Sequence, residues 1–272
     1  MADNNLRAIL CPNCGKMISA NAESCIYCGT KKPNMWGLAS VLRKYLGSNS
    51  SLVPIISTAC ICLYILSLLV KPDSILGEGG LFGLLRPDTA VLAKLGMTGR
   101  APVAMGRWWT LITAIYLHGG LMHIVFNVMW IRNLGPAVED FFGTSRSFII
   151  YTVAGAFGFF LSVMSGHYYT LGASGSIFGL LGALVYYGRK RGGTFGQAIY
   201  KQSATWAAAG FVLGLVFPIM DNAAHFGGFV GGYLTASVLG FVEIKREQRS
   251  HQLLALALIV LTVLSFVASI FS

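Results

Sequence analysis

Charged residues are scarce in this chain of 272 residues: only 11% are Asp, Glu, Lys or Arg, whereas 55% are hydrophobic. Soluble domains carry about 25% charged residues, so this composition excludes an ordinary soluble protein. The mean hydropathy of +0.66 points the same way. The class that remains is a multi-spanning membrane protein.

Residues 1–50 lack an apolar core long enough for a cleavable signal peptide, so we expect the first span to direct insertion. Seven later stretches are apolar enough to cross roughly 30 Å of hydrocarbon, and the second and fifth have the least defined edges. They are residues 52–70, 111–131, 147–165, 172–188, 203–219, 223–242 and 253–271. Cys60 and Cys62, in the first stretch, are interpreted as small apolar packing residues.

The net charge of +10 follows a topological pattern and does not call for a nucleic-acid partner. Basic residues gather before the first stretch and after the second, fourth and sixth, while loops 166–171 and 220–222 contain no Lys or Arg. The positive-inside rule then puts the N-terminus in the cytoplasm and the C-terminus outside, and we expect the plasma membrane. Loop 71–110 departs from the positive-inside rule, because it is predicted to lie outside and yet contains Lys71, Arg86, Lys94, Arg100 and Arg107.

Two C-x2-C motifs precede the membrane region, Cys11 with Cys14 and Cys25 with Cys28, separated by ten residues. Four thiolates at this spacing are typical of a tetrahedral zinc site of the ribbon type. A disulfide framework is disfavoured because the predicted orientation puts the segment in a reducing compartment. Four cysteines leave no open coordination position, so we expect structural Zn²⁺ in a cytoplasmic module of residues 1–33, where it also provides a docking site for a protein partner.

Residues 34–51 join this module to the first span. Apolar residues recur at helical intervals from Trp36 to Leu46, with Arg43 and Lys44 beside them. The pattern fits an amphipathic helix at the membrane surface, and a plain linker fits equally well.

A polar break, Gly172-Ala173-Ser174-Gly175, opens the fourth stretch, and His225 opens the sixth. Both stretches enter from the outside, so the two side chains share one depth, where polar groups are costly and usually functional. Glycines at 175, 179 and 182 and at 227, 228, 231 and 232 favour close contact between the two helices. That contact brings Ser174, a nucleophile, within reach of His225, a general base and acid.

His123 and Asn127 lie four residues apart in the second stretch, on one helix face. Two donors so placed suit an oxyanion site, although by themselves they fit an interhelical hydrogen bond better. His118 is interpreted as a structural group at the membrane interface. No carboxylate occurs at this depth, and Asp221 is interpreted as a solvated loop residue, which leaves a Ser-His dyad.

These motifs, His118 with His123-Ile124-Val125-Phe126-Asn127, Gly172-Ala173-Ser174-Gly175 and Ala224-His225-Phe226-Gly227-Gly228, resemble those of the rhomboid family of intramembrane serine proteases. The resemblance implies an all-α polytopic core of six helices over residues 52–243, a further helix in residues 244–272, and cleavage of transmembrane segments near their outer ends without a catalytic cofactor. Ser174 and His225 would be catalytic, with His123, Asn127 and the Ser174 N–H binding the oxyanion.

The chain departs from the family pattern at two places. Many members carry a Trp-Arg pair in the first loop, where this chain reads Trp109-Thr110 after Arg107, which questions how that loop is anchored. Some have a tyrosine packed on the catalytic histidine, where Phe178 keeps only the ring. The rival interpretation is a catalytically silent relative that binds membrane proteins or acts as a quality-control adaptor. A transporter would need ionisable groups near the midplane, and the spans show none convincingly placed there.

Overall fold

The computed structural model describes residues 8–11, 16–19, 22–27, 51–72, 85–217, 220–245 and 247–272. The chain divides into two compact units, Met1–Ser51 and Leu52–Ser272. In the first unit, β1 (Ala8–Leu10) pairs antiparallel with β2 (Met17–Ser19), with Ile9 opposite Ile18. Cys11 and Cys25 are buried with Ile18 in one small cluster. Cys14, Cys28 and the pattern over 34–47 fall outside the described residues.

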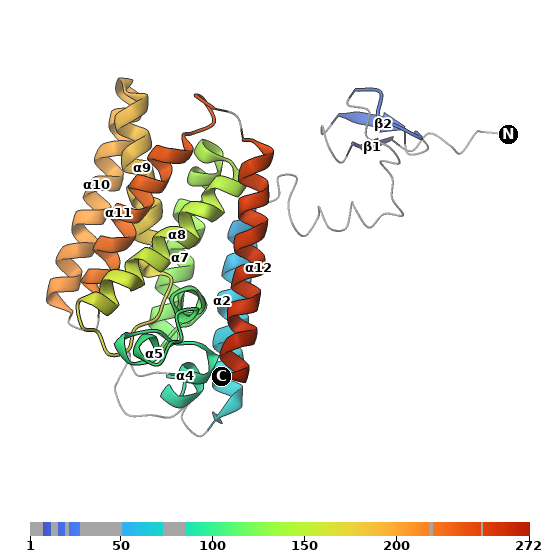
Figure 1. The fold of residues 1–272 in the computed structure, drawn as a ribbon. Helices are drawn as coiled ribbons and strands as arrows, with labels where there is room; N and C mark the ends of the chain where they lie inside the picture. The colour runs from blue at the N-terminus through green and yellow to red at the C-terminus, as the bar shows by residue number, and fades with distance from the viewer. Residues whose placement is uncertain are drawn as a thin grey trace. The chain divides into compact units, whose positions relative to one another are not determined.

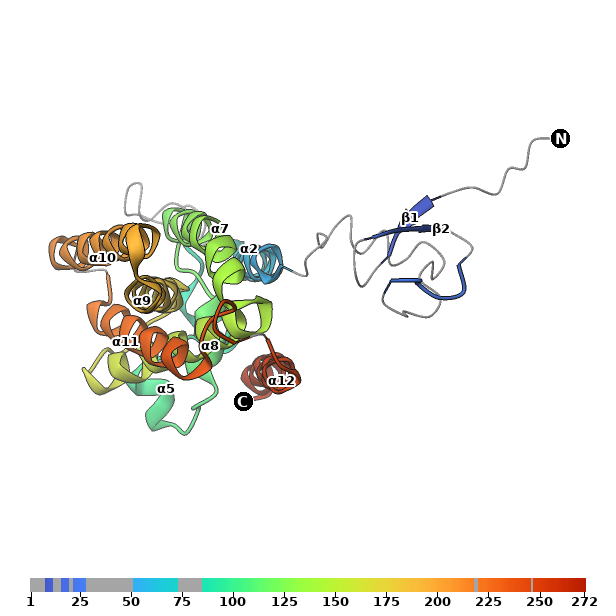
Figure 2. The same ribbon diagram turned by 90° about the horizontal axis from the view of Figure 1, so that it is seen from above.

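The second unit is a bundle of long helices, which Figures 1 and 2 show side by side. They are α2 (Leu52–Val70), α7 (Leu121–Phe142), α8 (Thr144–Met164), α9 (Ser174–Arg191), α10 (Gly193–Val216), α11 (Asn222–Leu239) and α12 (Arg249–Phe271). Seen from above, α9 lies among α7, α8, α10 and α11, and it contacts all four. Its residues from Gly175 to Val185 are accordingly all buried.

Two of the predicted stretches differ most from the helices that the structure shows. The second was expected at 111–131, but its long helix begins only at Leu121, because the chain bends by 91° between Thr110–Tyr116 and Leu121–Phe142. The fifth was expected from residue 203, whereas α10 begins at Gly193. In the first, Cys60 is buried as expected, but Cys62 is exposed and does not pack in the core.

Within the described residues, α2, α8 and α12 are each long and apolar enough to cross a membrane, and the bent pair makes a fourth span if it is counted as one. The other long helices are less apolar for visible reasons. The last residues of α9 are Arg189, Lys190 and Arg191, and α11 contains an asparagine, a histidine and four glycines. Glycines suit helices that face other helices, because they let two backbones approach closely.

The glycines of α11 face two different helices. A side chain at Gly228 or Gly232 would collide with the Gly175 or Gly179 carbonyl of α9, whereas Gly227 and Gly231 face α8. The sequence placed all four of these glycines on one side of the helix, and only 228 and 232 make the predicted contact with α9. The predicted contact between the fourth and sixth spans is therefore confirmed at the level of the backbone.

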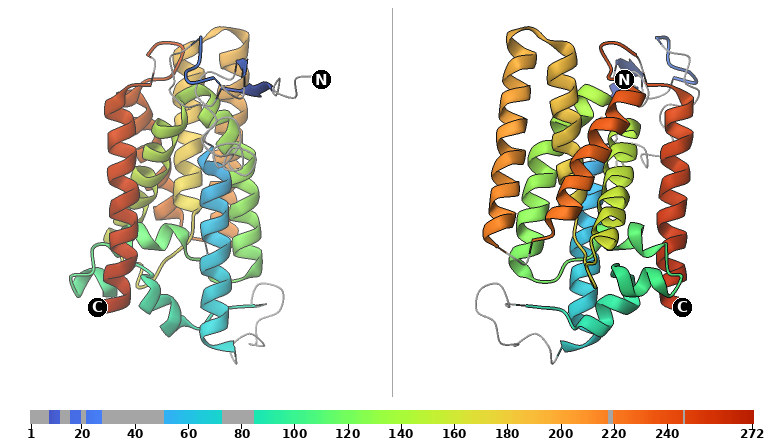
Figure 3. Two further views of the ribbon diagram at one scale, coloured as in Figure 1. Left: turned by 90° about the vertical axis from the view of Figure 1, so that its right-hand side faces the viewer. Right: turned by 60° about the vertical axis from the view of Figure 1, so that its left-hand side comes forward.

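Shorter elements cover one end of the bundle: α4 (Thr89–Leu95), α5 (Arg100–Ala104), α6 (Thr110–Thr113) and η3 (Ala114–Tyr116). Figure 3 shows them at the end where α12 finishes. Asp88 caps α4 by accepting hydrogen bonds from the Ala90 and Val91 amides. Lys71 Nζ donates to Asp88 Oδ2 at 2.7 Å, and this bond holds the pKa of the carboxyl below its usual value.

The opposite end of the bundle is held by Arg146, whose side chain is fully buried. Its Nη1 donates to the Gly240 carbonyl at 3.0 Å, at the end of α11. Glu247 Oε1 accepts from the Ser145 amide at 2.8 Å, which caps the start of α8. The connection leading to α12 is thereby fixed to the ends of α8 and α11.

Candidate active site

Ser174 is the first residue of α9. The chain reaches it through Gly172, whose φ of +123° favours glycine and whose N–H donates to the Ala114 carbonyl at 2.9 Å. A Cβ at Gly172 would also lie only 2.5 Å from His123 Nε2. The first glycine of the polar break is therefore required by both backbone conformation and space.

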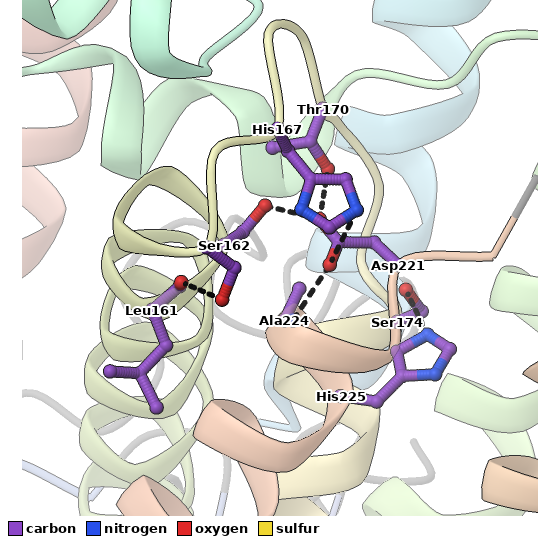
Figure 4. Close-up of polar contacts among 9 residues, drawn as sticks. Leu161, Ser162, His167, Thr170, Ser174, Asp221, Ala224 and His225 are labelled. Carbon is purple, nitrogen blue, oxygen red and sulfur yellow. Dashed lines mark hydrogen bonds and ion pairs between the residues drawn. The ribbon is translucent and has the colours of Figure 1, made fainter.

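His225 lies in the first turn of α11, and its Nε2 is 3.0 Å from Ser174 Oγ (Figure 4). Both positions depend on the contact between α9 and α11, since Gly175 and Gly228 follow one and three residues later and touch through their backbones. The His225 side chain is buried, with 5% exposure. A hydroxyl and an imidazole nitrogen at this distance can exchange a proton.

Phe178 fixes the plane of the imidazole from one turn further along α9. The Phe178 and His225 rings are nearly parallel, 4.2 Å apart with an interplanar angle of 12°, so the stack expected from the sequence is present. Gly210 of α10 lies behind Phe178, and a Cβ there would come within 2.5 Å of its Cζ. The ring is thus held between Gly210 and His225.

The other imidazole nitrogen, Nδ1 of His225, is buried and has no hydrogen-bond partner among the described residues. If Nε2 accepts the Ser174 proton, Nδ1 carries the ring's own hydrogen. No carboxylate bonds to it, so within the described residues the arrangement is a pair and not a triad.

Asp221 is not the solvated loop residue that the sequence indicated. It is the N-cap of α11, its side chain is only 13% exposed, and its Oδ1 accepts from the Ala224 amide at 2.9 Å. Its Oδ2 accepts from Ser162, at the end of α8, and from Thr170 Oγ1 at 2.8 Å. His167 Nε2 lies 3.6 Å from Oδ1. Figure 4 shows the carboxylate joining these segments above His225.

His123 lies in the first turn of α7 and faces Gly172. Its Nδ1 accepts a hydrogen bond from the Gly119 amide at 3.3 Å, which leaves the proton on Nε2, the atom nearest to Gly172. Asn127 is buried, and its Nδ2 donates to the His123 carbonyl at 2.7 Å. That bond uses one of two amide hydrogens, so the side chain keeps a second donor.

His118 was expected within the second span, at the membrane interface. It lies instead in the non-helical segment before α7, and its side chain is fully buried. Its ring centroid is 5.1 Å from that of His123, at 65°. His118 therefore packs against the ring of His123.

The start of α9 adds donors that no side chain provides. The first amides of a helix have no carbonyl partner in the preceding turn, and the helix dipole makes that end favourable for negative charge. Ser174 is the first helical residue, so its own N–H belongs to this set. A serine hydroxyl, an imidazole and several N–H donors therefore gather at one place, and acyl transfer requires groups of these kinds.

Sequence reasoning missed the roles of Asp221, Thr170 and Gly210. An aspartate directly before an apolar helix is a common N-cap signal, so the cap of α11 was readable at Asp221. The bonds from Ser162 and Thr170 were not, because they join segments more than 50 residues apart.

Comparison with known proteins identifies both parts of the chain. The Rhomboid domain matches residues 105–242, half of the chain, and a zinc-ribbon domain matches residues 10–32. The chain is 34% identical over 174 residues to Rhomboid protease GluP of Bacillus subtilis (strain 168), a match that covers 62% of this chain and 34% of GluP.

Two further relatives also have rhomboid names. RHOMBOID-like protein 5 of Arabidopsis thaliana is 35% identical over 178 residues, covering 62% of this chain and 54% of that protein. Putative rhomboid protease YdcA of Bacillus subtilis (strain 168) is 33% identical over 174 residues, covering 63% of this chain and 85% of YdcA. The chain thus spans about a third and a half of the length of the first two relatives. With its apolar helices and these matches, the chain is an integral multi-pass membrane protein that belongs to the rhomboid family and carries a zinc-ribbon domain near its N-terminus.

Proposed function

We propose that this protein is an intramembrane serine endopeptidase that cleaves transmembrane segments of other membrane proteins by a Ser174–His225 dyad. The observation that carries the proposal is the 3.0 Å distance between Ser174 Oγ and His225 Nε2 inside a helical bundle. Membership of the rhomboid family, and the naming of GluP as a rhomboid protease, support it.

In the first half of the reaction, Ser174 Oγ attacks the carbonyl carbon of the scissile bond while His225 Nε2 takes its proton. The negative charge that develops on the carbonyl oxygen is met by the Ser174 N–H, His123 Nε2–H and the second amide hydrogen of Asn127. His225 then returns the proton to the leaving amine, the C–N bond breaks, and an acyl-enzyme remains on Ser174.

The second half uses the same groups with water as the nucleophile. His225 takes a proton from water, the hydroxide adds to the acyl carbon, and His225 protonates Ser174 Oγ as the ester bond breaks. Phe178 keeps the imidazole in one plane through both steps, and Gly172 leaves the space that His123 needs. Neither step requires a metal or a nucleotide.

The proposed orientation puts this site near the outer leaflet of the plasma membrane. Ser174 begins α9, and the three basic residues Arg189 to Arg191 end it, so the positive-inside rule assigns the far end of α9 to the cytoplasm. The N-terminus is then cytoplasmic and the C-terminus outside. Water can reach a site at the outer end without crossing the bilayer. The lipid bilayer itself is a partner of the protein.

For the N-terminal region we propose a structural Zn²⁺ held by Cys11, Cys14, Cys25 and Cys28. Cys11 and Cys25, one from each motif, are buried in the same small cluster, which fits thiolates that converge on one ion. The module of residues 1–33 would dock a cytoplasmic protein, residues 34–51 would link it to the protease core of residues 52–243, and residues 244–272 would add the last span.

The test compares Ser174→Ala with Ser176→Ala in a transmembrane reporter cleavage assay in reconstituted membranes. Ser176 is a control from the same turn of α9, and its side chain is buried whereas Ser174 is partly exposed. We expect Ser174→Ala to abolish cleavage and Ser176→Ala to retain it. Undiminished cleavage by Ser174→Ala would overturn the proposal, and no cleavage by the wild type across a panel of reporter substrates would favour a silent binder.

A further inference from the structure

The last turn of α12 holds the segment that leads into the active site. Ser269 is fully buried in that turn. Trp109 Nε1 donates to Ser269 Oγ at 3.1 Å, and Arg107 Nη2 donates to the Ser269 carbonyl at 3.4 Å. Arg107 and Trp109, the loop residues whose anchoring the sequence left in question, therefore have a partner on the seventh long helix.

Two more contacts close this arrangement. Arg107 Nη1 donates to the Ala93 carbonyl at 3.2 Å, in the last turn of α4, where a cation also complements the helix dipole. Thr113 Oγ1 donates to the Gly96 carbonyl at 2.7 Å. Gly96 has a φ of +103°, and a Cβ there would lie 2.5 Å from Ser269 Oγ. We call Gly96, Arg107, Trp109, Thr113 and Ser269 the latch.

The latch residues flank Thr98 and Arg100, and these two residues form backbone hydrogen bonds with the segment before Ser174. Thr98 and Thr170 exchange two backbone hydrogen bonds, of 3.2 and 2.7 Å, and the Arg100 amide donates to the His167 carbonyl at 2.8 Å. The Thr110 and Thr98 hydroxyls share a hydrogen bond, with 3.0 Å between their oxygens, which ties α6 to the same bridge.

From this bridge two short connections reach the dyad. Thr170 Oγ1 donates to Asp221, the cap of the helix that carries His225. Gly172, which lies two residues before Ser174, donates its amide hydrogen to the Ala114 carbonyl. A displacement of the latch segment would be transmitted to both members of the dyad.

We propose that the last turn of α12 is a positioning element for catalysis, acting through the latch and the Thr98–Thr170 bridge. It touches neither substrate nor the reacting atoms. Its effect is to hold residues 170–174 and the start of α11 in fixed positions relative to each other, so that Ser174 and His225 stay within hydrogen-bond distance. This inference rests on the proposed function for its catalytic readout, and the latch itself has a structural readout that is independent of it.

The test is Ser269→Ala in the full-length protein, with Ser265→Ala as the matched control. Ser265 is also buried in α12, one turn earlier, but its hydroxyl donates to the Leu261 carbonyl of its own helix at 2.7 Å. We expect Ser269→Ala to lower kcat about five- to tenfold with little change in KM, as the loss of about one hydrogen bond predicts, and Ser265→Ala to leave kcat unchanged.

Two further measurements separate positioning from general destabilisation. If Trp109 and Ser269 act through one bond, Trp109→Phe combined with Ser269→Ala should be no slower than the worse single variant. Hydrogen–deuterium exchange should become faster at the Thr98 and Thr170 amides in Ser269→Ala and stay unchanged in Ser265→Ala.

The outcomes distinguish the two proposals. A wild-type protein that neither cleaves reporters nor reacts with a fluorophosphonate probe at Ser174 would overturn the proposed function. The hydrogen–deuterium exchange result would still decide whether the latch fixes the Thr98–Thr170 bridge. Unchanged exchange at Thr98 and Thr170 in Ser269→Ala would overturn the latch. So would equal kcat values for the two serine variants in an active enzyme.

Discussion

Gly228→Ala is the substitution that most directly tests whether close packing of α9 and α11 sets the geometry of the dyad. An ideal Cβ on Gly228 would lie 2.0 Å from the Gly175 carbonyl oxygen, whereas ordinary contacts of this kind begin at 3.4 Å. Because the obstacle is backbone and not a movable side chain, the two helices have to separate by about 1.4 Å at this point.

Gly228 follows His225 by three residues, and Gly175 directly follows Ser174, so the separation occurs at the dyad. It would carry His225 Nε2 from 3.0 Å to beyond 4 Å from Ser174 Oγ, which is outside hydrogen-bond range. Misplacement of about 1 Å costs on the order of 100-fold in rate, and overpacking costs about 1–3 kcal/mol of stability. We therefore expect cleavage to fall by about 100-fold or more.

The assay is reporter cleavage in proteoliposomes together with thermal unfolding in detergent. Gly231→Ala is the control on the same helix, because its Cβ would face α8 and come no nearer than 3.1 Å to Phe157. That contact needs a shift of only a few tenths of an ångström, so activity should remain within a few-fold of wild type. Wild-type cleavage by Gly228→Ala, or equal losses in the two variants, would show that this helix contact does not set the geometry of the dyad.

Three other predictions test separate parts of the account. Gly210→Ala should press Phe178 against His225 and lower kcat about tenfold or more, since the added Cβ would lie 2.5 Å from the ring; unchanged kinetics would exclude a role for the stack. Asp221→Ala should cost about 1–3 kcal/mol in unfolding experiments, because it removes a cap and a partly buried acceptor of several bonds, with Asp221→Asn milder; equal stability of both variants to wild type would contradict this. Metal analysis should find one zinc per chain, lost in Cys25→Ser while cleavage in detergent persists; a metal-free wild type would disprove the site.

The pairing of Ser174 with His225 was predictable because two local signals agreed. The glycines on both spans indicated close contact, and each polar residue opened its span at the same end. Hydrophobic periodicity and small-residue patterns depend on neighbours within one helix, so they can be read from the sequence without knowledge of the rest of the fold. The sequence did not separate Gly228, which faces α9, from Gly231, which faces α8.

What the sequence could not provide were contacts between distant segments. Ser269 is one of several serines in an apolar helix, and only the fold brings it to Arg107 and Trp109, about 160 residues earlier. The bend before Leu121 was hidden because hydropathy does not distinguish a broken span from a continuous one. Asp221 was misjudged for a related reason: a carboxylate in a connection looks exposed until Ser162 and Thr170 are placed against it.

Covalent labelling tests whether Ser174 is a nucleophile activated by His225. A fluorophosphonate probe is reacted with the protein in lipid nanodiscs, and the modified residue is located by peptide mass spectrometry. We expect an adduct on Ser174, none on Ser176, and labelling slowed by at least about 100-fold in His225→Ala. Labelling of another residue, or Ser174 labelling that does not depend on His225, would contradict this expectation.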